Sequence, residues 1–160
     1  MKLNIGCGDY IVDGFVNCDM YNNKADIKCD AKSLPFEDNS VEEIYTFHLI
    51  EHFDFHEAFI AVREWYRVLM IGGLLHIETP DLLGSCKKFI EIQNDYDKVM
   101  KFYSHFFAMP WIPGQTHKFM YVESQLKYLL ENCGFINIKR VIADRYNNNE
   151  DVNLGMIGYK

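Results

Sequence analysis

Residues 3–10, LNIGCGDY, form a short apolar run that leads directly into two glycines separated by one residue. Glycine permits a sharp turn and lets a ligand approach the backbone closely. In a doubly wound α/β sheet, the turn after the first strand lies at the carboxyl edge, where ligands bind. The dinucleotide fingerprint G-x-G-x-x-G is incomplete, because Ile11 occupies the third glycine position. The turn alone therefore leaves an ordinary tight turn and a ligand-binding turn equally open.

Short apolar runs alternate with amphipathic stretches along the rest of the chain. The patterns predict strands over residues 2–6, 15–19, 26–30, 43–47, 74–79, 136–145 and 153–159. They predict helices over residues 56–69, 83–107 and 123–133, with Gly72-Gly73 ending the first helix and Gly134 ending the last.

Strands that alternate with helices predict an α/β fold with a mostly parallel sheet. Only the polar stretch YNNNED (146–151) separates the last two strands, so they should form an antiparallel hairpin at one edge. The gaps between the first four strands barely fit full crossover helices, which predicts thin cover on one face of the sheet. We expect residues 1–160 to form a single domain.

The composition limits the classes of function. A net charge of −7 without a basic cluster argues against nucleic-acid binding. The five cysteines include no C-x-x-C pair, so we expect buried free thiols in a reducing compartment. With neither a leader-like N-terminus nor an apolar stretch of membrane-spanning length, the sequence predicts a cytoplasmic protein without a membrane contact.

Two acids stand at the ends of the predicted second and third strands. VNCD ends in Asp19, whose carboxylate could accept hydrogen bonds from both hydroxyls of a ribose. KCDA places Asp30 at the next strand end, where it could meet the exocyclic amine of an adenine. A glycine turn followed by two acids at successive strand ends is more specific than any one of these features.

The order LNIGCG, VNCD, DAKSLPFEDNSVEEIYTFHLIEH and EWYRVLMIGGLLHIETPDL resembles the class I S-adenosylmethionine-dependent methyltransferases, in particular the small type 11 group. The resemblance covers residues 2–82, and LKYLLENCGFINIKR (126–140) resembles the late helix and strand of that family. It implies a Rossmann-like sheet and S-adenosyl-L-methionine as cofactor. It also implies these roles: Asn4, Gly6, Cys7 and Gly8 beside the methionine part, Asp19 at the ribose, Met20 beside the adenine, and Asp30 with the backbone of Ala31 at the adenine amine.

The sequence departs from the family pattern in three places. Asn4 replaces an acid that family members often carry, IGG replaces the usual PGG, and the N-terminal helices are reduced. The reduction leaves the cover over the cofactor to a partner subunit in a homodimer or to residues 105–118.

The stretch HLIEH (48–52) matches the H-x-x-E-H signature of one class of zinc peptidases. That site needs both histidines on one continuous helix, whereas the preceding alternation is typical of a strand. We therefore expect no metal here, and the resembling family carries a similar motif without one. His48 is either a general base or a wall of the cofactor pocket, and His52 either orients the site or is structural. Glu51 is interpreted as an acid at a helix N-terminus.

The segment SHFFAMPWIPGQTHKFMY (104–121) is rich in aromatic residues and lies where this fold builds its substrate wall. The alternative is a packed loop. Four of its residues are substrate candidates: Phe106, Trp111, His117 and Tyr121. The sequence thus predicts a methyltransferase acting on an oxygen or nitrogen of a small molecule. The rivals are a zinc peptidase using His48, Glu51 and His52, and a non-catalytic protein that binds the cofactor or S-adenosylhomocysteine.

Overall fold

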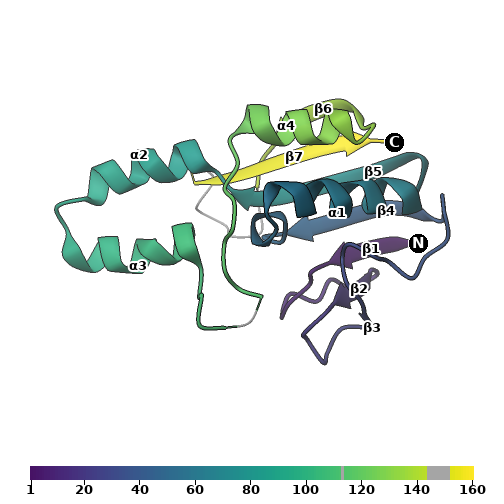
Figure 1. Ribbon diagram of the computed structural model, residues 1–160, viewed down its shortest axis with the longest axis horizontal. Helices are drawn as coiled ribbons and strands as arrows, with labels where there is room; N and C mark the ends of the chain where they lie inside the picture. The colour runs from purple at the N-terminus through teal and green to yellow at the C-terminus, as the bar shows by residue number, and fades with distance from the viewer. Residues whose placement is uncertain (113, 144–151) are drawn as a thin grey trace.

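A seven-stranded sheet forms the centre of the computed structural model, which describes residues 1–112, 114–143 and 152–160 (Figure 1). The strand order is β3-β2-β1-β4-β5-β7-β6. Strands β1 to β5 run parallel, and β7 is antiparallel to both of its neighbours. The strands are β1 Lys2–Ile5, β2 Val16–Asp19, β3 Ile27–Lys28, β4 Val41–Phe47, β5 Leu69–Pro80, β6 Ile136–Val141 and β7 Asn153–Tyr159.

The predicted fold class is confirmed, including the antiparallel edge hairpin. Every predicted strand is present, although β3 is shorter and β5 is longer than the pattern predicted. The end of the strand predicted over 136–145, and the loop YNNNED, lie outside the described residues. The first four strands are joined without a helix, as their short spacing predicted. The order reverses between β1 and β4, which creates a crevice at the carboxyl ends of these two strands.

Helix α1 (Phe55–Val68) begins at a capping box, in which Asp54 accepts from the Glu57 N–H and Glu57 accepts from the Asp54 N–H. The prediction that Gly72-Gly73 ends this helix is wrong. The chain becomes extended at Leu69, and both glycines lie within β5. Gly72 has a φ of 81°, and its N–H donates to the carbonyl of Lys160. Its left-handed conformation therefore forms an irregular position within the strand.

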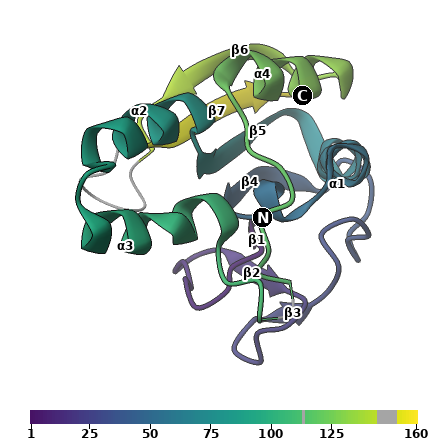
Figure 2. The same ribbon diagram turned by 60° about the vertical axis from the view of Figure 1, so that its left-hand side comes forward.

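The single helix predicted over 83–107 is instead a pair of helices, α2 (Leu82–Ile92) and α3 (Tyr96–Phe107). The break occurs because Asp95 caps the second helix by accepting from the N–H of Lys98. The pair extends beyond the sheet, and the segment after α3 runs past the carboxyl ends of β1 and β2 before it reaches α4 (Glu123–Asn132) (Figures 1 and 2).

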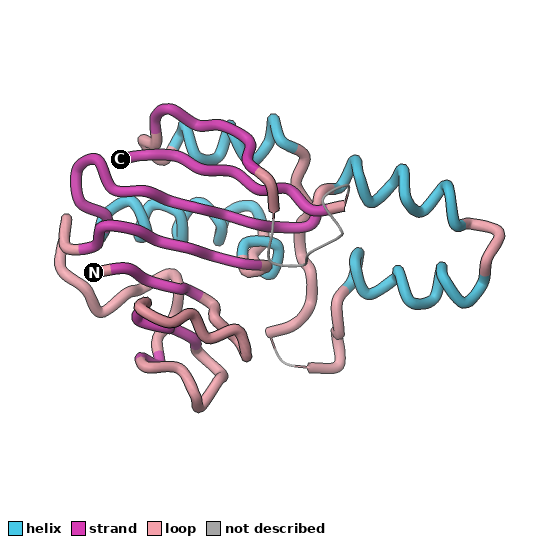
Figure 3. Tube along the Cα trace, turned by 180° about the vertical axis from the view of Figure 1, so that it is seen from behind, coloured by secondary structure: helices cyan, strands magenta, loops and turns pink. Residues whose placement is uncertain are grey.

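The core lies between the sheet and helices α1 and α4, which cover one face (Figure 1). Among the described residues no helix covers the other face, as Figure 3 shows from behind. That face carries a row of aromatic rings instead, in which Tyr45 stacks on His76 at 4.9 Å and meets Phe15 edge-on at 5.0 Å. Thin cover on this face, predicted from the short connections, is therefore confirmed.

Three of the five free cysteines are buried, but Cys86 on α2 is exposed, which corrects the expectation that the thiols are buried. In the part of the chain that the structure describes, every helix is too short or too polar to cross a bilayer.

Candidate functional site

A cleft of about 1280 Å³ opens where β1, β2 and β4 end. The glycine turn, the ends of β2 and β3, the segment after β4 and the segment after α3 line it. Small-molecule sites commonly occupy about 300–1000 Å³, so the cleft has room for a cofactor and a second molecule. The sequence left the cover over the cofactor to a partner subunit or to residues 105–118. Residues of that segment line the cleft.

The glycine turn presents its backbone to the cleft. Gly6 and Gly8 have φ angles of 67° and 48°, in the left-handed region that favours glycine. A Cβ on Gly6 would come within 2.7 Å of the Leu49 side chain, whereas a Cβ on Gly8 would meet nothing within 4 Å. Gly8 thus leaves an open approach to the backbone, which fits the cradle expected for the methionine part of the cofactor.

Asp19 ends β2 at the floor of the cleft, where Met20 also lines it. The Asp19 carboxylate accepts three backbone N–H bonds, from Gly8 at 2.9 Å, Tyr21 at 2.7 Å and Asn22 at 2.8 Å. A carboxylate has about four acceptor positions, so one remains for a ribose hydroxyl. Asp19 thus differs from the sequence prediction of acceptance from both ribose hydroxyls, because three of its positions tie the glycine turn to the loop after β2.

Asp30 and Ala31 line the cleft beside Cys29. Asp30 accepts from the N–H of Lys32 at 2.9 Å, and the buried Trp65 donates its Nε1–H to the carbonyl of Ala31 at 2.9 Å. The second bond fixes the turn after β3 to helix α1. The structure therefore brings Asp30 and Ala31, like Met20, to the same cleft as Asp19.

Two of the predicted cofactor residues do not line the cleft. Asn4 is 1% exposed, and its amide donates to the carbonyl of Tyr10 at 2.7 Å and to Asn17 at 2.9 Å. Cys7 is equally buried. Side chains alternate along a strand, so Asn4 points to the face opposite Leu3 and Ile5 and supports the loop rather than a ligand.

His48 leaves the end of β4 and lines the cleft. Its φ of 53° is unusual for a residue with a side chain, and its N–H donates to the carbonyl of Glu78 at 2.8 Å. Its Nδ1 lies 3.1 Å from Oε1 of Glu51, which is fully buried. Glu51 stands in the first turn of a short 3-10 helix (Ile50–His52), as interpreted, but its carboxylate is buried against His48 and Thr79.

The Glu51 carboxylate has two further neighbours. Its Oε2 accepts from the hydroxyl of Thr79 at 3.0 Å, and its Oε1 lies 3.8 Å from Nε2 of His117. Burial raises the pKa of Glu51, but the hydrogen bond with His48 and the nearby imidazoles outweigh burial, and the net pKa is lowered. The carboxylate is thus ionised at neutral pH and can hold the Nδ1 proton of His48.

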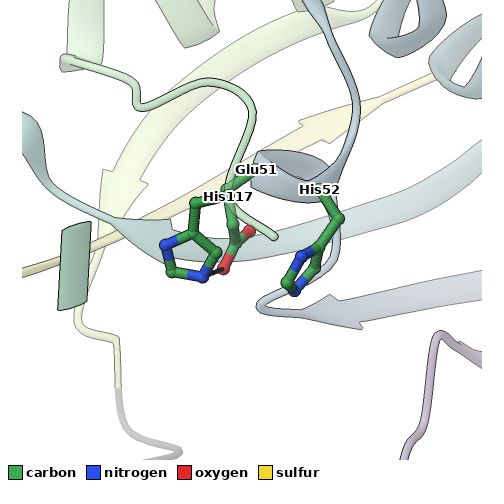
Figure 4. Close-up of side chains that lie close together, drawn as sticks. All are labelled: Glu51, His52 and His117. Carbon is green, nitrogen blue, oxygen red and sulfur yellow. Dashed lines mark ion pairs between the residues drawn. The ribbon is translucent and has the colours of Figure 1, made fainter. Parts of the chain in front are cut away.

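His52 and His117 lie close together, with ring centroids 5.0 Å apart. Both line the cleft, and neither sits on a helix with His48. The two histidines of HLIEH are therefore not presented on one helical face, as the zinc-peptidase alternative requires. Figure 4 shows the Glu51 carboxylate between the rings of His52 and His117.

Only one of the four substrate candidates reaches the cleft. His117 does, whereas Tyr121 is fully buried in the core and Trp111 is 77% exposed outside the cleft. Phe106 packs against Phe89 within the α2–α3 pair. The aromatic pattern singled out a segment that lines the cleft, but it could not give side-chain directions. It missed three of the lining residues, namely His105, Met109 and Ile112.

Solved structures share this fold. A SAM-dependent methyltransferase from Methanosarcina mazei matches with a TM-score of 0.66 and 21% identity, over 99% of this chain and 91% of that one. A SAM-dependent methyltransferase from Archaeoglobus fulgidus matches with a TM-score of 0.65 and 16% identity, over 99% of this chain and 85% of that one. A Thermotoga maritima protein described as a possible histamine N-methyltransferase matches with a TM-score of 0.62 and 18% identity, over 99% of this chain and 81% of that one. At such identities the likeness establishes the fold alone.

The family model described as a methyltransferase domain matches residues 11–77. That span contains Asp19, Asp30 and His48. A search of curated proteins finds no significant match. The methyltransferase-domain match, which covers less than half of the chain, and the fold shared with SAM-dependent methyltransferases together support a class I methyltransferase with S-adenosyl-L-methionine as cofactor.

Proposed function

We propose that the chain transfers a methyl group to an oxygen or nitrogen of a small molecule held in the cleft, with His48 as the general base. The observation that carries the proposal is the His48–Glu51 pair in the wall of the cleft that also contains the glycine turn and Asp19. The cofactor supplies a methyl group on a sulfonium. The chain positions the acceptor and removes its proton.

The pair supports a base at His48. Nδ1 of His48 lies 3.1 Å from the buried Glu51 carboxylate, whose charge would stabilise the imidazolium that forms when His48 takes up a proton. His48 could instead serve as a wall of the cofactor pocket, in which case alignment alone would lower the barrier.

The charge of the cleft favours an uncharged or cationic acceptor. Asp9, Asp19, Asp30 and Glu57 line it, and the two lining lysines, Lys32 and Lys118, both pair with Glu57, at 2.8 and 2.7 Å. A polyanion would meet these acids without a free cation among the described lining residues, which argues against nucleic acid. The name of the Thermotoga maritima relative, a possible histamine N-methyltransferase, is consistent with a small amine.

The test is methyl transfer from labelled S-adenosylmethionine to a panel of small amines, phenols and alcohols, with RNA and unrelated protein as competing acceptors. We expect label in a small amine or hydroxyl compound. Label only in RNA or protein would contradict the acceptor class. Tight cofactor binding without transfer to any acceptor would favour the rival, a non-catalytic protein that binds the cofactor.

A further inference from the structure

Three potential metal ligands converge on the cleft wall. Glu51, His52 and His117 each offer a ligand atom, and these three atoms lie within 4.8 Å of one another. Glu51 and His52 come from the turn after β4, and His117 comes from the segment after α3 (Figure 4). The two parts are fixed together, because the carbonyl of Glu51 accepts from the N–H groups of Lys118 and Phe119 at 2.8 and 3.2 Å.

Backbone carbonyls set the tautomer of both rings. His52 Nδ1 lies 3.1 Å from the carbonyl oxygen of Thr116, and His117 Nδ1 lies 3.1 Å from that of His105. A neutral ring that donates its Nδ1–H to a carbonyl carries its lone pair on Nε2. Metal-binding histidines are commonly held in this way, with the second nitrogen donating to a backbone carbonyl or a carboxylate.

Among the described residues, no lysine or arginine forms an ion pair with the buried Glu51 carboxylate. Its ion-pair neighbours among the described residues are the imidazoles of His48 and His117. An ionised carboxylate with no exposure is costly to bury unless a cation or a metal balances it.

We propose that Glu51, His52 and His117 form a binding site for a divalent first-row transition metal. Two imidazoles and one carboxylate suit Zn²⁺, Co²⁺, Fe²⁺ or Mn²⁺ better than Ca²⁺, which takes mainly oxygen ligands. With bonds of about 2.1 Å, ligand atoms around such an ion lie roughly 3.0–3.4 Å apart. The Glu51 and His117 atoms are 3.8 Å apart and all three ligand atoms lie within 4.8 Å of one another, so binding would draw them inward.

This site differs from the zinc-peptidase site, because His117 replaces His48 as the second histidine. Both histidines line the cleft, so the remaining coordination positions of the ion face it. On the proposed function, an acceptor hydroxyl bound to the ion would lose its proton more easily, and His48 would receive that proton.

The test is a Co²⁺ titration of the full chain after treatment with a chelator, without cofactor or acceptor. We expect one Co²⁺ per chain by equilibrium dialysis, with visible absorption of a nitrogen and oxygen site. His117→Ala and Glu51→Gln should each weaken binding by at least about tenfold. His56→Ala, on the exposed side of α1, is the matched control, and Cys29→Ser controls for a thiol of the same cleft.

The proposal fails if the parent takes up no Co²⁺ at millimolar concentration, or if His117→Ala binds it as tightly as the parent. It also fails if the absorption shows a thiolate band that Cys29→Ser removes. Should His117→Ala not fold, as judged by circular dichroism, His117→Gln replaces it. Since the titration involves no methyl transfer, its failure leaves the proposed function to be judged by the acceptor panel.

Discussion

The Nδ1 atom of His48 lies 3.1 Å from the fully buried carboxylate of Glu51, three residues further along the chain. The contact depends on the backbone of His48, whose φ of 53° turns the chain sharply at the end of β4. A left-handed conformation of a non-glycine residue costs about 1–3 kcal/mol, and such strain is concentrated at functional sites.

The first prediction concerns this pair. If His48 is the base, His48→Gln should slow methyl transfer by roughly 10²–10⁴ while cofactor affinity stays within a few-fold. Glutamine keeps polarity and approximate reach but takes up no proton at neutral pH. Single-turnover rates with an acceptor from the panel measure the effect, with His56→Ala as a control outside the cleft.

Glu51→Gln should also slow transfer, but less than His48→Gln, because the amide can still orient the ring and only the stabilising charge is lost. A His48→Gln variant that turns over at nearly the parent rate would make His48 a wall of the cofactor pocket, as the alternative interpretation holds.

The second prediction concerns the loss of folding stability at acidic pH. Burial lowers the pKa values of His105 and His117 from their ordinary value of 6.5. The unfolded chain therefore binds protons at a higher pH than the folded chain does, and folding stability should fall as the pH falls below about 6.5. Glu51 acts in the same direction only at lower pH, since its pKa is lowered from 4.5.

Thermal unfolding between about pH 7.5 and pH 5.5 tests this. The midpoint should decrease with acid, and His105→Gln, which removes one of the two groups, should reduce that decrease. A parent midpoint that is constant or rises with acid would show that these histidines are not held uncharged.

The third prediction uses two glycines with the same backbone constraint. Gly8 and Gly14 both have positive φ angles, and a Cβ would meet nothing within 4 Å at either. Alanine should cost each about 1–2 kcal/mol of stability. Only Gly8 lines the cleft, so Gly8→Ala should weaken S-adenosylmethionine binding strongly, whereas Gly14→Ala should not. Equal losses in both variants, measured by calorimetry, would indicate that the glycine turn is structural.

Local patterns predicted most of the fold. Apolar runs, glycines and caps determined the positions of the strands and of α1 and α4. The break between α2 and α3 was missed because Asp95 caps a helix inside one continuous amphipathic pattern. The end of α1 was misplaced because Gly72 and Gly73 serve β5, where pairing with β4 and β7 overrides the usual meaning of a glycine pair.

The sequence could predict which residues line the cleft only where the position of the backbone decides whether a side chain reaches the cleft. Asp19, Met20, Asp30 and His48 stand at strand ends, so their side chains reach the cleft whatever packs around them. The contacts of Glu51 were missed because its partners, Thr79 and His117, are distant in sequence. Likewise, no spacing rule connects His117 with HLIEH, so the sequence alone could not group it with Glu51 and His52.

Calorimetric titration of the chain with S-adenosylmethionine tests the central claim most directly, that the cleft is the cofactor site with Asp19 at its floor. The parent should bind one molecule. Asp19→Asn should bind at least about tenfold more weakly, a loss of about 1.4 kcal/mol, because the amide carries no charge and accepts at one oxygen only. Asp13→Asn, the same change at an exposed position outside the cleft, should bind like the parent. Unchanged affinity in Asp19→Asn, with the fold intact by circular dichroism, would contradict the account.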